Sequence, residues 1–160
     1  MVLEALAGIP EFELETCELD RNSPSYMVES LQILRARYGE KQPLCLILGT
    51  DAFAHITSWY QWERLLALTH LAIFNRPESP FQVPAQLDAL HPNCVISETD
   101  KLKNMSSGLI ISLKESVPLT VSSTQIRDAF RSNQDPRFLL PDPVRRYIHH
   151  HAIYKETPNL

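Results

Sequence analysis

Three hydroxyl residues and an arginine lie close together in residues 119–130, which read LTVSSTQIRDAF. A β-branched run stops at Ser122, and a helical pattern then begins. The spacing of Ser122 and Gln125 predicts a capping box, in which each side chain bonds the other residue's backbone N–H. The same helix start would offer free N–H groups and a positive dipole end to a phosphate. Both interpretations stay open on this stretch alone. The phosphate interpretation uses the hydroxyls and the guanidinium of Ser122, Ser123, Thr124 and Arg127.

Other polar or aromatic residues follow two apolar runs. Gly49 permits close backbone approach, and Asp51 could accept a hydrogen bond from a ligand hydroxyl, although a turn with a helix cap explains them equally well. Arg76 precedes a proline, where a lone arginine is usually a solvated charge. Trp59 could stack on a flat ring or belong to the core, and we expect Trp62 to be core. Two anion donors and a ring platform at strand ends together indicate a nucleotide-like ligand.

The elements that must position these residues alternate between strands and helices. Continuous apolar runs suit strands buried on both faces of a sheet, so we predict an α/β fold with a mostly parallel sheet. Ligands of such sheets bind at the carboxyl ends of the strands. Residues 78–108 are expected to be loops with one short helix or strand. We predict strands within 12–19, 43–50, 70–75 and 108–121, and helices within 3–8, 26–39, 59–69, 122–133 and 139–154.

Composition limits the function classes. The chain has 160 residues, enough for a single domain over 1–160, and 44% of them are hydrophobic. A net charge of −4 gives no general attraction to nucleic acid, and no apolar run approaches a membrane span. The N-terminus lacks the basic region of a signal peptide. Cys17, Cys45 and Cys94 are widely spaced, which predicts buried reduced thiols in a cytoplasmic protein and no metal site.

An ordered set of motifs carries a family resemblance. The segments are RNSPSYMVESL, LILGTDAF, SWYQWERLL, HLAIFNRP, VSSTQIRDAF and LLPDPVRRYI followed by IY. Their order and spacing resemble bacterial nicotinate-nucleotide adenylyltransferases along essentially the whole chain. The resemblance implies a Rossmann-like nucleotidyltransferase fold. It also implies that AMP passes from ATP to nicotinate mononucleotide with Mg²⁺, giving nicotinate adenine dinucleotide and pyrophosphate.

The resemblance also assigns residues. The family motif that holds the ATP phosphates matches Ser122, Ser123, Thr124 and Arg127. Trp59 matches the residue that stacks on the pyridine ring, and Tyr60 matches the position whose backbone N–H meets the nicotinate carboxylate. Asp51 matches a substrate-side aspartate, and Arg76 matches an arginine near the site. The segment that frames the pyridine pocket matches Ser25, Tyr26 and Met27.

Two departures from the family pattern bear on activity. Met27 stands where the family usually has threonine. The 160 residues contain no H-x-G-H motif, whose histidines grip the ATP phosphates in the family, so the resemblance assigns no catalytic residue here. Met1 aligns near the end of the family's second helix, so the chain resembles the C-terminal two-thirds of the enzyme.

The missing motif leads us to expect impaired adenylyl transfer by the 160 residues and an exposed flank on a central strand. Three explanations stay open: an internal methionine recorded as the start, a truncated gene, or a new role. The rival function is a non-catalytic nucleotide-binding module. The oligomeric state does not follow from the sequence.

Overall fold

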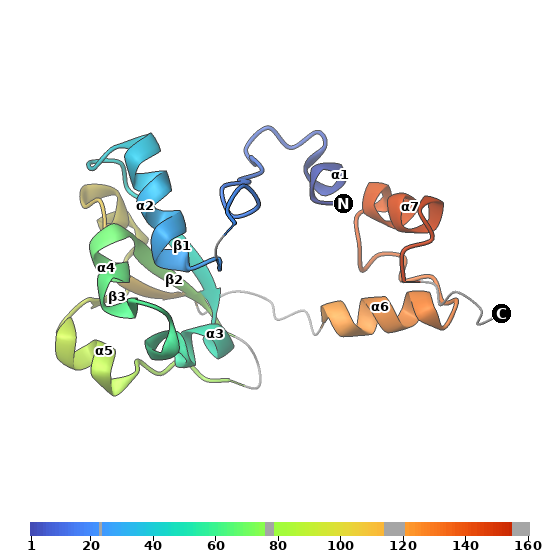
Figure 1. Ribbon diagram of the computed structural model, residues 1–160. Coiled ribbons are helices and arrows are strands. Elements are labelled where there is room, and N and C mark those ends of the chain that lie inside the picture. Colours follow the sequence, from blue (N-terminus) through green and yellow to red (C-terminus); the bar gives the residue numbers. More distant parts are fainter. Residues whose placement is uncertain (23, 76–78, 114–120, 155–160) are drawn as a thin grey trace. The chain divides into compact units, whose positions relative to one another are not determined.

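The computed structural model describes residues 1–22, 24–75, 79–113 and 121–154. The chain forms two compact units. One consists of Met1–Thr16 together with Leu119–Leu160, and the other is Cys17–Pro118 (Figure 1). Within the described ranges, no helix has both the length and the apolar character needed to cross a membrane.

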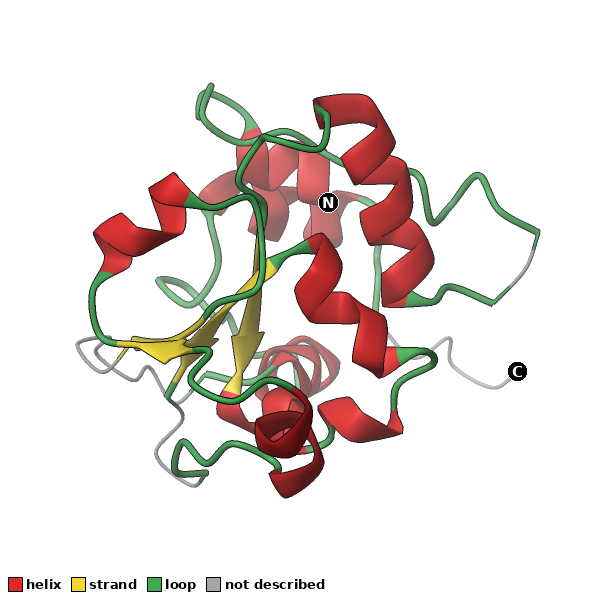
Figure 2. Ribbon diagram, turned by 90° about the vertical axis from the view of Figure 1, so that its left-hand side faces the viewer, coloured by secondary structure: helices red, strands yellow, loops and turns green. Residues whose placement is uncertain are grey.

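A four-stranded parallel sheet forms the centre of the unit Cys17–Pro118. Its strands are β1 (Cys45–Gly49), β2 (His70–Phe74), β3 (Val95–Ile96) and β4 (Ile110–Leu113), in the order β1-β2-β4-β3. All three pairings are parallel, and Gly49 at the end of β1 lies opposite Phe74 at the end of β2. Figure 2 shows the strands with helices packed around them. The prediction of an α/β fold with a parallel sheet is therefore confirmed.

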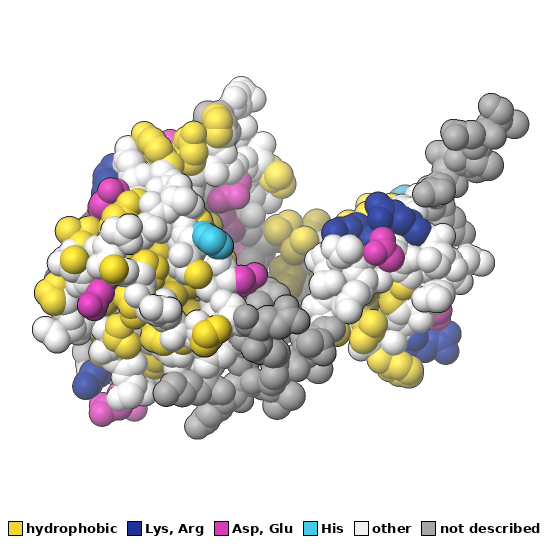
Figure 3. All heavy atoms as spheres, turned by 90° about the horizontal axis from the view of Figure 1, so that it is seen from below, with side chains coloured by type: hydrophobic (Ala, Val, Ile, Leu, Met, Phe, Trp, Pro, Cys, Tyr) yellow, Lys and Arg dark blue, Asp and Glu magenta, His cyan; other side chains and the backbone are white. Residues whose placement is uncertain are grey.

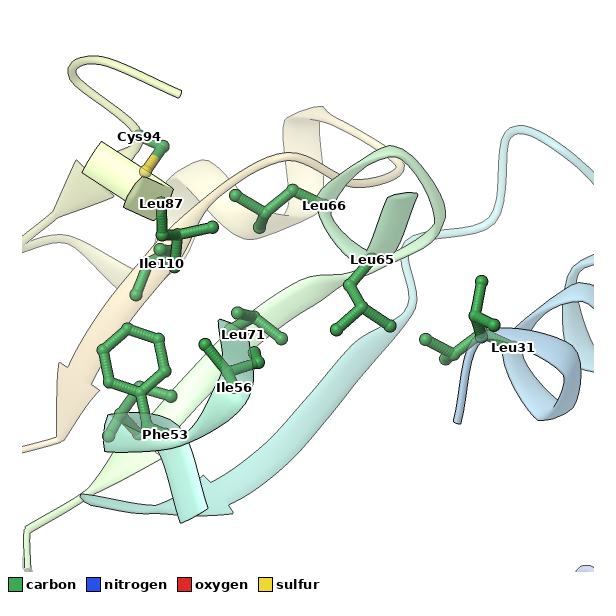
Figure 4. Packing of buried hydrophobic residues seen from close by; sticks show 11 residues of the cluster. Leu31, Phe53, Ile56, Leu65, Leu66, Leu71, Leu87, Cys94 and Ile110 are labelled. Carbon is green, nitrogen blue, oxygen red and sulfur yellow. The ribbon is translucent and has the colours of Figure 1, made fainter. Parts of the chain in front are cut away.

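One helix precedes the strands of this unit, and shorter helices connect them. They are α2 (Met27–Tyr38), α3 (Thr50–Ala54), α4 (Leu65–Leu68) and α5 (Ala85–Leu90), with the 3-10 helices η1 (Ile56–Ser58), η2 (Trp62–Arg64) and η3 (Thr99–Asn104). Leu71, Ile73 and Ile110 of the sheet are fully buried. They form one core cluster with helical side chains such as Leu31 and Phe53 (Figure 4). Removing this apolar surface from water is the main source of this unit's stability.

Arg35 holds the loops that lead into three strands. Its side chain is buried in α2 and donates only to backbone carbonyls. Nε lies 3.2 Å from the Leu68 oxygen, before β2, and Nη2 lies 3.0 Å from the Ser106 oxygen, before β4. Nη1 bonds the carbonyls of Gly39 and Gln42, before β1. One guanidinium thus satisfies carbonyls of three loops at the amino-terminal edge of the sheet.

His70 acts at the same edge. Its ring is fully buried at the start of β2. Nδ1 accepts from the Leu109 N–H at 3.1 Å, and Nε2 lies 2.9 Å from the Met105 oxygen. Because Nδ1 accepts, Nε2 is the ring atom that donates to the Met105 carbonyl. The loop before β4 is therefore held by both His70 and Arg35.

The other unit contains three helices, α1 (Val2–Leu6), α6 (Ser123–Arg131) and α7 (Asp142–His150). Phe130, Val144 and Ile148 form its buried cluster, against which Ile126 and Tyr154 pack. Pro143 lies in the first turn of α7, as predicted, where its missing N–H costs nothing. The predicted helices at 3–8, 122–133 and 139–154 are thus present, and the first begins one residue earlier than predicted.

Three expectations about secondary structure are wrong. Residues 78–108 were expected to contain one short helix or strand, whereas their described part contains α5, β3 and η3. Residues 12–19 form no strand, and the apolar side chains of Phe12 and Leu19 are 65% and 80% exposed. Alternation alone makes no strand when no neighbouring strand pairs with the segment. The predicted helix at 59–69 is a tight turn followed by η2 and α4, because Gln61 has a left-handed backbone with φ 50°.

Strand β1 is less buried than its sequence predicts. Ile47 is 65% exposed and Cys45 is exposed as well, whereas His70–Ile73 of β2 are buried. β1 is at the end of the strand order of the described sheet.

The cysteines carry no disulfide, and two of the three are buried as expected. Partial desolvation nevertheless raises the pKa of the Cys45 thiol, so it stays protonated at neutral pH.

Candidate functional site

The start of α6 is a complete capping box. Ser122 has extended backbone angles, and its Oγ accepts from the Gln125 N–H at 3.1 Å. In return the Gln125 Oε1 accepts from the Ser122 N–H at 2.9 Å. These reciprocal bonds confirm the cap that the spacing predicts. These two bonds fix the conformation of the first helical turn, and they need no ligand to do so.

This helix start keeps donors for an anion. The N–H groups of Ser123 and Thr124 have no partner among the described residues, as expected for the first positions of a helix. The Arg127 Nη2 donates to the Thr124 Oγ1 at 3.1 Å, which draws the guanidinium toward the same end of the helix. Two backbone amides, exposed hydroxyls and a guanidinium therefore meet at the positive end of the helix dipole.

Arg127 differs from three other arginines of its unit in that it forms no ion pair with a described carboxylate. Figure 3 shows basic side chains grouped on the unit that contains α6. Within the described ranges, Arg127 has no carboxylate within ion-pair distance, so its charge is free to meet a phosphate. Three other arginines of this unit are each bound to an aspartate in the pairs Arg131–Asp128, Arg137–Asp135 and Arg145–Asp135.

A tight turn carries the two residues assigned to the pyridine ring. The Trp62 N–H donates to the Trp59 carbonyl at 3.2 Å and closes a four-residue turn. Tyr60 is the second residue of that turn, and its N–H has no partner in the described part of the chain. Trp59 and Trp62 are partly buried and pack against the core. The turn thus combines a ring platform with an open N–H.

Tyr60 also meets the segment that starts α2. The ring centroids of Tyr26 and Tyr60 are 4.3 Å apart at an interplanar angle of 33°. Tyr26 is the N-cap residue of α2, and Ser25 before it is exposed. The Met27 side chain is partly buried and packs against the core. The methionine that replaces the family's threonine therefore acts as an apolar core residue in this structure.

The carboxyl ends of the strands place a third group of residues. Asp51 is exposed in the first turn of α3, directly after β1. Asn75 follows β2, and its Oδ1 accepts from the Ser112 hydroxyl of β4 at 3.4 Å. Arg76 lies outside the described residues. Asp51 and Asn75 therefore lie at the same edge of the sheet, where parallel sheets bind ligands.

The predicted site residues divide between the two units. The pyridine-side residues of the described chain belong to the unit Cys17–Pro118, and the phosphate-side residues belong to the unit with α6. No cluster of three or more His, Cys, Asp or Glu suited to a metal ion occurs among the described residues. The predicted site residues therefore form two groups, one in each unit, and we refer to these predicted groups as half-sites.

Sequence reasoning missed two features of the pyridine side. One is the contact between Tyr26 and Tyr60, which are far apart in sequence and gave no signal of pairing. The other is Gln61, whose amide bonds the Tyr60 hydroxyl at 2.8 Å. A polar residue between aromatic ones could have indicated a turn there, but the helical period of the following leucines hid it.

Comparison with known proteins identifies the family. Residues 1–129 match the cytidylyltransferase-like family. A Pseudomonas putida (strain W619) protein named "Probable nicotinate-nucleotide adenylyltransferase" is 37% identical over 159 residues, which cover 99% of this chain and 71% of that protein. A Methylococcus capsulatus (strain ATCC 33009 / NCIMB 11132 / Bath) protein of the same name is 36% identical over 143 residues, 89% of this chain and 67% of its own.

A solved structure shares the fold. The Plasmodium falciparum nicotinic acid mononucleotide adenylyltransferase complexed with APC superposes with a TM-score of 0.55 at 17% identity. The match covers 83% of this chain, which spans 60% of the length of that one. The parallel sheet with its helices is a Rossmann-like nucleotidyltransferase fold.

Proposed function

Because the chain belongs to the nicotinate-nucleotide adenylyltransferase family, we propose that it transfers AMP from ATP to nicotinate mononucleotide. The products are nicotinate adenine dinucleotide and pyrophosphate, and the reaction serves NAD biosynthesis in the cytoplasm. The observation that carries this proposal is the start of α6, where a capping box, two open N–H groups and Arg127 form an anion site.

The reaction needs positioning more than a reactive side chain. A phosphate oxygen of the mononucleotide attacks the α-phosphorus of ATP, the bond to the β-phosphate oxygen breaks, and pyrophosphate leaves with that electron pair. No covalent intermediate with the protein is required. Charge develops on the phosphoryl oxygens, so donors fixed in advance lower the barrier. The N–H groups of Ser123 and Thr124, with the Ser122 hydroxyl and Arg127, supply such donors on the ATP side.

The turn at Trp59 and Tyr60 suits the other substrate. The indole of Trp59 would stack on the pyridine ring, and the open N–H of Tyr60 would donate to the nicotinate carboxylate. A carboxylate accepts at both oxygens, whereas an amide presents a donor on one side, so this contact favours the acid. We assign Asp51 and Arg76 to the same substrate, with Ser25, Tyr26 and Met27 framing the pocket.

We propose that Mg²⁺ enters as the complex with ATP, as part of the substrate. Its usual ligands in such reactions are phosphate oxygens with one or two carboxylates. The described residues contain no dedicated cluster of three ligands, which is compatible with a metal carried by the nucleotide.

The binding test separates the two half-sites. Loss of stacking costs about 1–3 kcal/mol per ring, so Trp59→Ala should raise the Kd for nicotinate mononucleotide about tenfold and leave the Kd for ATP unchanged. Arg127→Ala should raise the Kd for ATP and leave the Kd for nicotinate mononucleotide unchanged. Isothermal titration calorimetry with each ligand measures both. Arg131→Ala is the matched control, because Arg131 lies one turn further along α6 and is bound to Asp128. If both variants bind both ligands like the parent, the assignment is wrong.

The second candidate function is a nucleotide-binding module without catalysis. It is favoured by one observation, the absence of an H-x-G-H sequence from the 160 residues. A polypeptide of these residues is expected to bind both nucleotides but to release little pyrophosphate. Rapid pyrophosphate release from ATP and nicotinate mononucleotide by that polypeptide would exclude the module and support the enzyme.

A further inference from the structure

Gln61 links three side chains beside the proposed pyridine site. Its Nε2 donates to the Tyr60 hydroxyl at 2.8 Å, and its Oε1 accepts from the Arg64 Nη1 at 2.5 Å. The Arg64 N–H also donates to the Gln61 carbonyl at 3.0 Å. Both hydrogen-bonding atoms of the amide are used, so the side chain is held at both ends.

The backbone of Gln61 supports a positioning role. Its φ of 50° and ψ of 39° lie in the left-handed region, which residues other than glycine and asparagine seldom adopt. This conformation reverses the chain between Trp59 and Trp62 and so creates the turn that leaves the Tyr60 N–H open. The side-chain bonds to Tyr60 and Arg64 lie across that reversal. They are suited to hold it in place.

The Tyr60 ring is otherwise weakly restrained. The residue is 48% exposed, and its partner in ring contact, Tyr26, is 37% exposed. Tyr26 is itself fixed through its carbonyl, which accepts from the N–H groups of Glu29 and Ser30 in α2. An exposed tyrosine without a tether samples several rotamers. The Gln61 amide is the described group that restrains the Tyr60 hydroxyl.

We propose that Gln61 is a positioning residue for the nicotinate ring. Its amide holds Tyr60 against Tyr26 and keeps the Tyr60 N–H directed at the carboxylate of an aromatic acid. The inference rests on the proposed function, because it concerns the affinity of the same site. It goes beyond it by naming a residue that acts through Tyr60 and has no assigned contact with either substrate.

A double-mutant cycle tests the link. Gln61→Met keeps the side-chain length and removes both hydrogen bonds, and Tyr60→Phe removes the hydroxyl alone. A neutral side-chain hydrogen bond is worth about fivefold in an equilibrium constant. Each single variant should therefore raise the Kd for nicotinate mononucleotide about fivefold, and the double variant should raise it no further. The Kd for ATP should stay the same, since the phosphate half-site is untouched.

Controls keep the outcomes distinct. Gln82→Met changes an exposed glutamine of the same unit whose amide has no partner among the described residues, and it should bind like the parent. Calorimetry on the full chain measures the parent and all four variants, with thermal unfolding to confirm that each is folded. The role of Gln61 would be overturned if the increases in Kd of the two single variants added up in the double variant, or if Gln61→Met bound nicotinate mononucleotide like the parent. Either result would leave the proposed function intact. A parent that binds ATP but no nicotinate mononucleotide would instead overturn the proposed function.

Discussion

Ser122 has two tasks at the start of α6. Its Oγ accepts from the Gln125 N–H, which caps the helix, and its exposed hydroxyl hydrogen can still turn toward a phosphate. Cap and anion site are therefore compatible uses of one residue. The sequence already predicts that the two uses are compatible, because the helix end that needs a cap is also the end that attracts an anion. The geometry confirms the cap, and the anion site stays a prediction.

Substitutions at Ser122 separate these tasks. Ser122→Ala removes the cap and should lower the free energy of unfolding by about 1 kcal/mol. Ser122→Asp keeps a good cap at the positive end of the helix dipole, so stability should change by less than about 0.5 kcal/mol. Its carboxylate would occupy the place of a phosphate, and the Kd for ATP should rise about tenfold or more. Urea unfolding and calorimetry measure these quantities, and an aspartate variant that binds ATP normally would contradict the anion site.

Local spacing made some residues predictable and left others hidden. Ser122 and Gln125 are three positions apart, and the cap follows from helix geometry alone. Gln61 could not be predicted in the same way. Its left-handed backbone overrides the helical period of the leucines after it, and its partner Tyr60 meets Tyr26 only once the chain has folded.

At the scale of elements, the two edges of the sheet have different roles. The amino-terminal edge carries Arg35 and His70, which bond the loops before β1, β2 and β4. The carboxyl edge carries Asp51 and Asn75, where ligands of parallel sheets bind. Buried polar groups thus fix the strands at one end, and polar residues follow two of the strands at the other.

Removing the Arg35 guanidinium should destabilise the sheet without altering binding. Arg35→Met removes a buried guanidinium and leaves the carbonyls of Gln42, Leu68 and Ser106 without this donor, and we expect a loss of about 3 kcal/mol or more in the free energy of unfolding. Lys41→Met, at an exposed position, should change it by less than about 0.5 kcal/mol. Urea denaturation followed by circular dichroism gives both values. Equal stability of the two variants would show that the carbonyls find other partners.

Helices and strands could be predicted where a local sequence pattern determines them. The predictions were wrong where the structure depends on pairing between distant segments. The helices at 27–38 and 123–131 and the strands β2 and β4 follow from periodicity and apolar runs. The strand expected within 12–19 is absent because no described strand pairs with it. Arg35 was missed because its partner carbonyls lie up to 71 positions away in sequence.

At the scale of the whole molecule, each unit has its own core. Among the described residues, the cluster of Cys17–Pro118 contains eleven buried residues, and that of the unit with α6 contains three. Less buried apolar surface gives less stability against opening. The expectation of a single domain over 1–160 stays a prediction, because separate cores are equally compatible with two regions that open independently.

Hydrogen exchange should resolve the two cores. Backbone amides of α6 and α7 should exchange faster than those of β2, whose central residues are fully buried. Saturating ATP should slow exchange at the start of α6, because a ligand stabilises the region that binds it. Nicotinate mononucleotide should slow exchange in the turn at Trp59 instead. Mass spectrometry after deuterium labelling measures each region, and uniform protection by either ligand would contradict the division into half-sites.

The turn at residues 59–62 holds both tryptophans of the chain. All indole fluorescence of the protein therefore originates from the segment to which the pyridine ring is assigned. A stacked pyridine withdraws electron density from an excited indole, so occupancy of that pocket would dim the emission with no label attached. Events confined to α6 would leave the signal unchanged. The chain thus contains its own optical reporter for one substrate, and a simple titration in a fluorimeter can follow that substrate in the presence of the other.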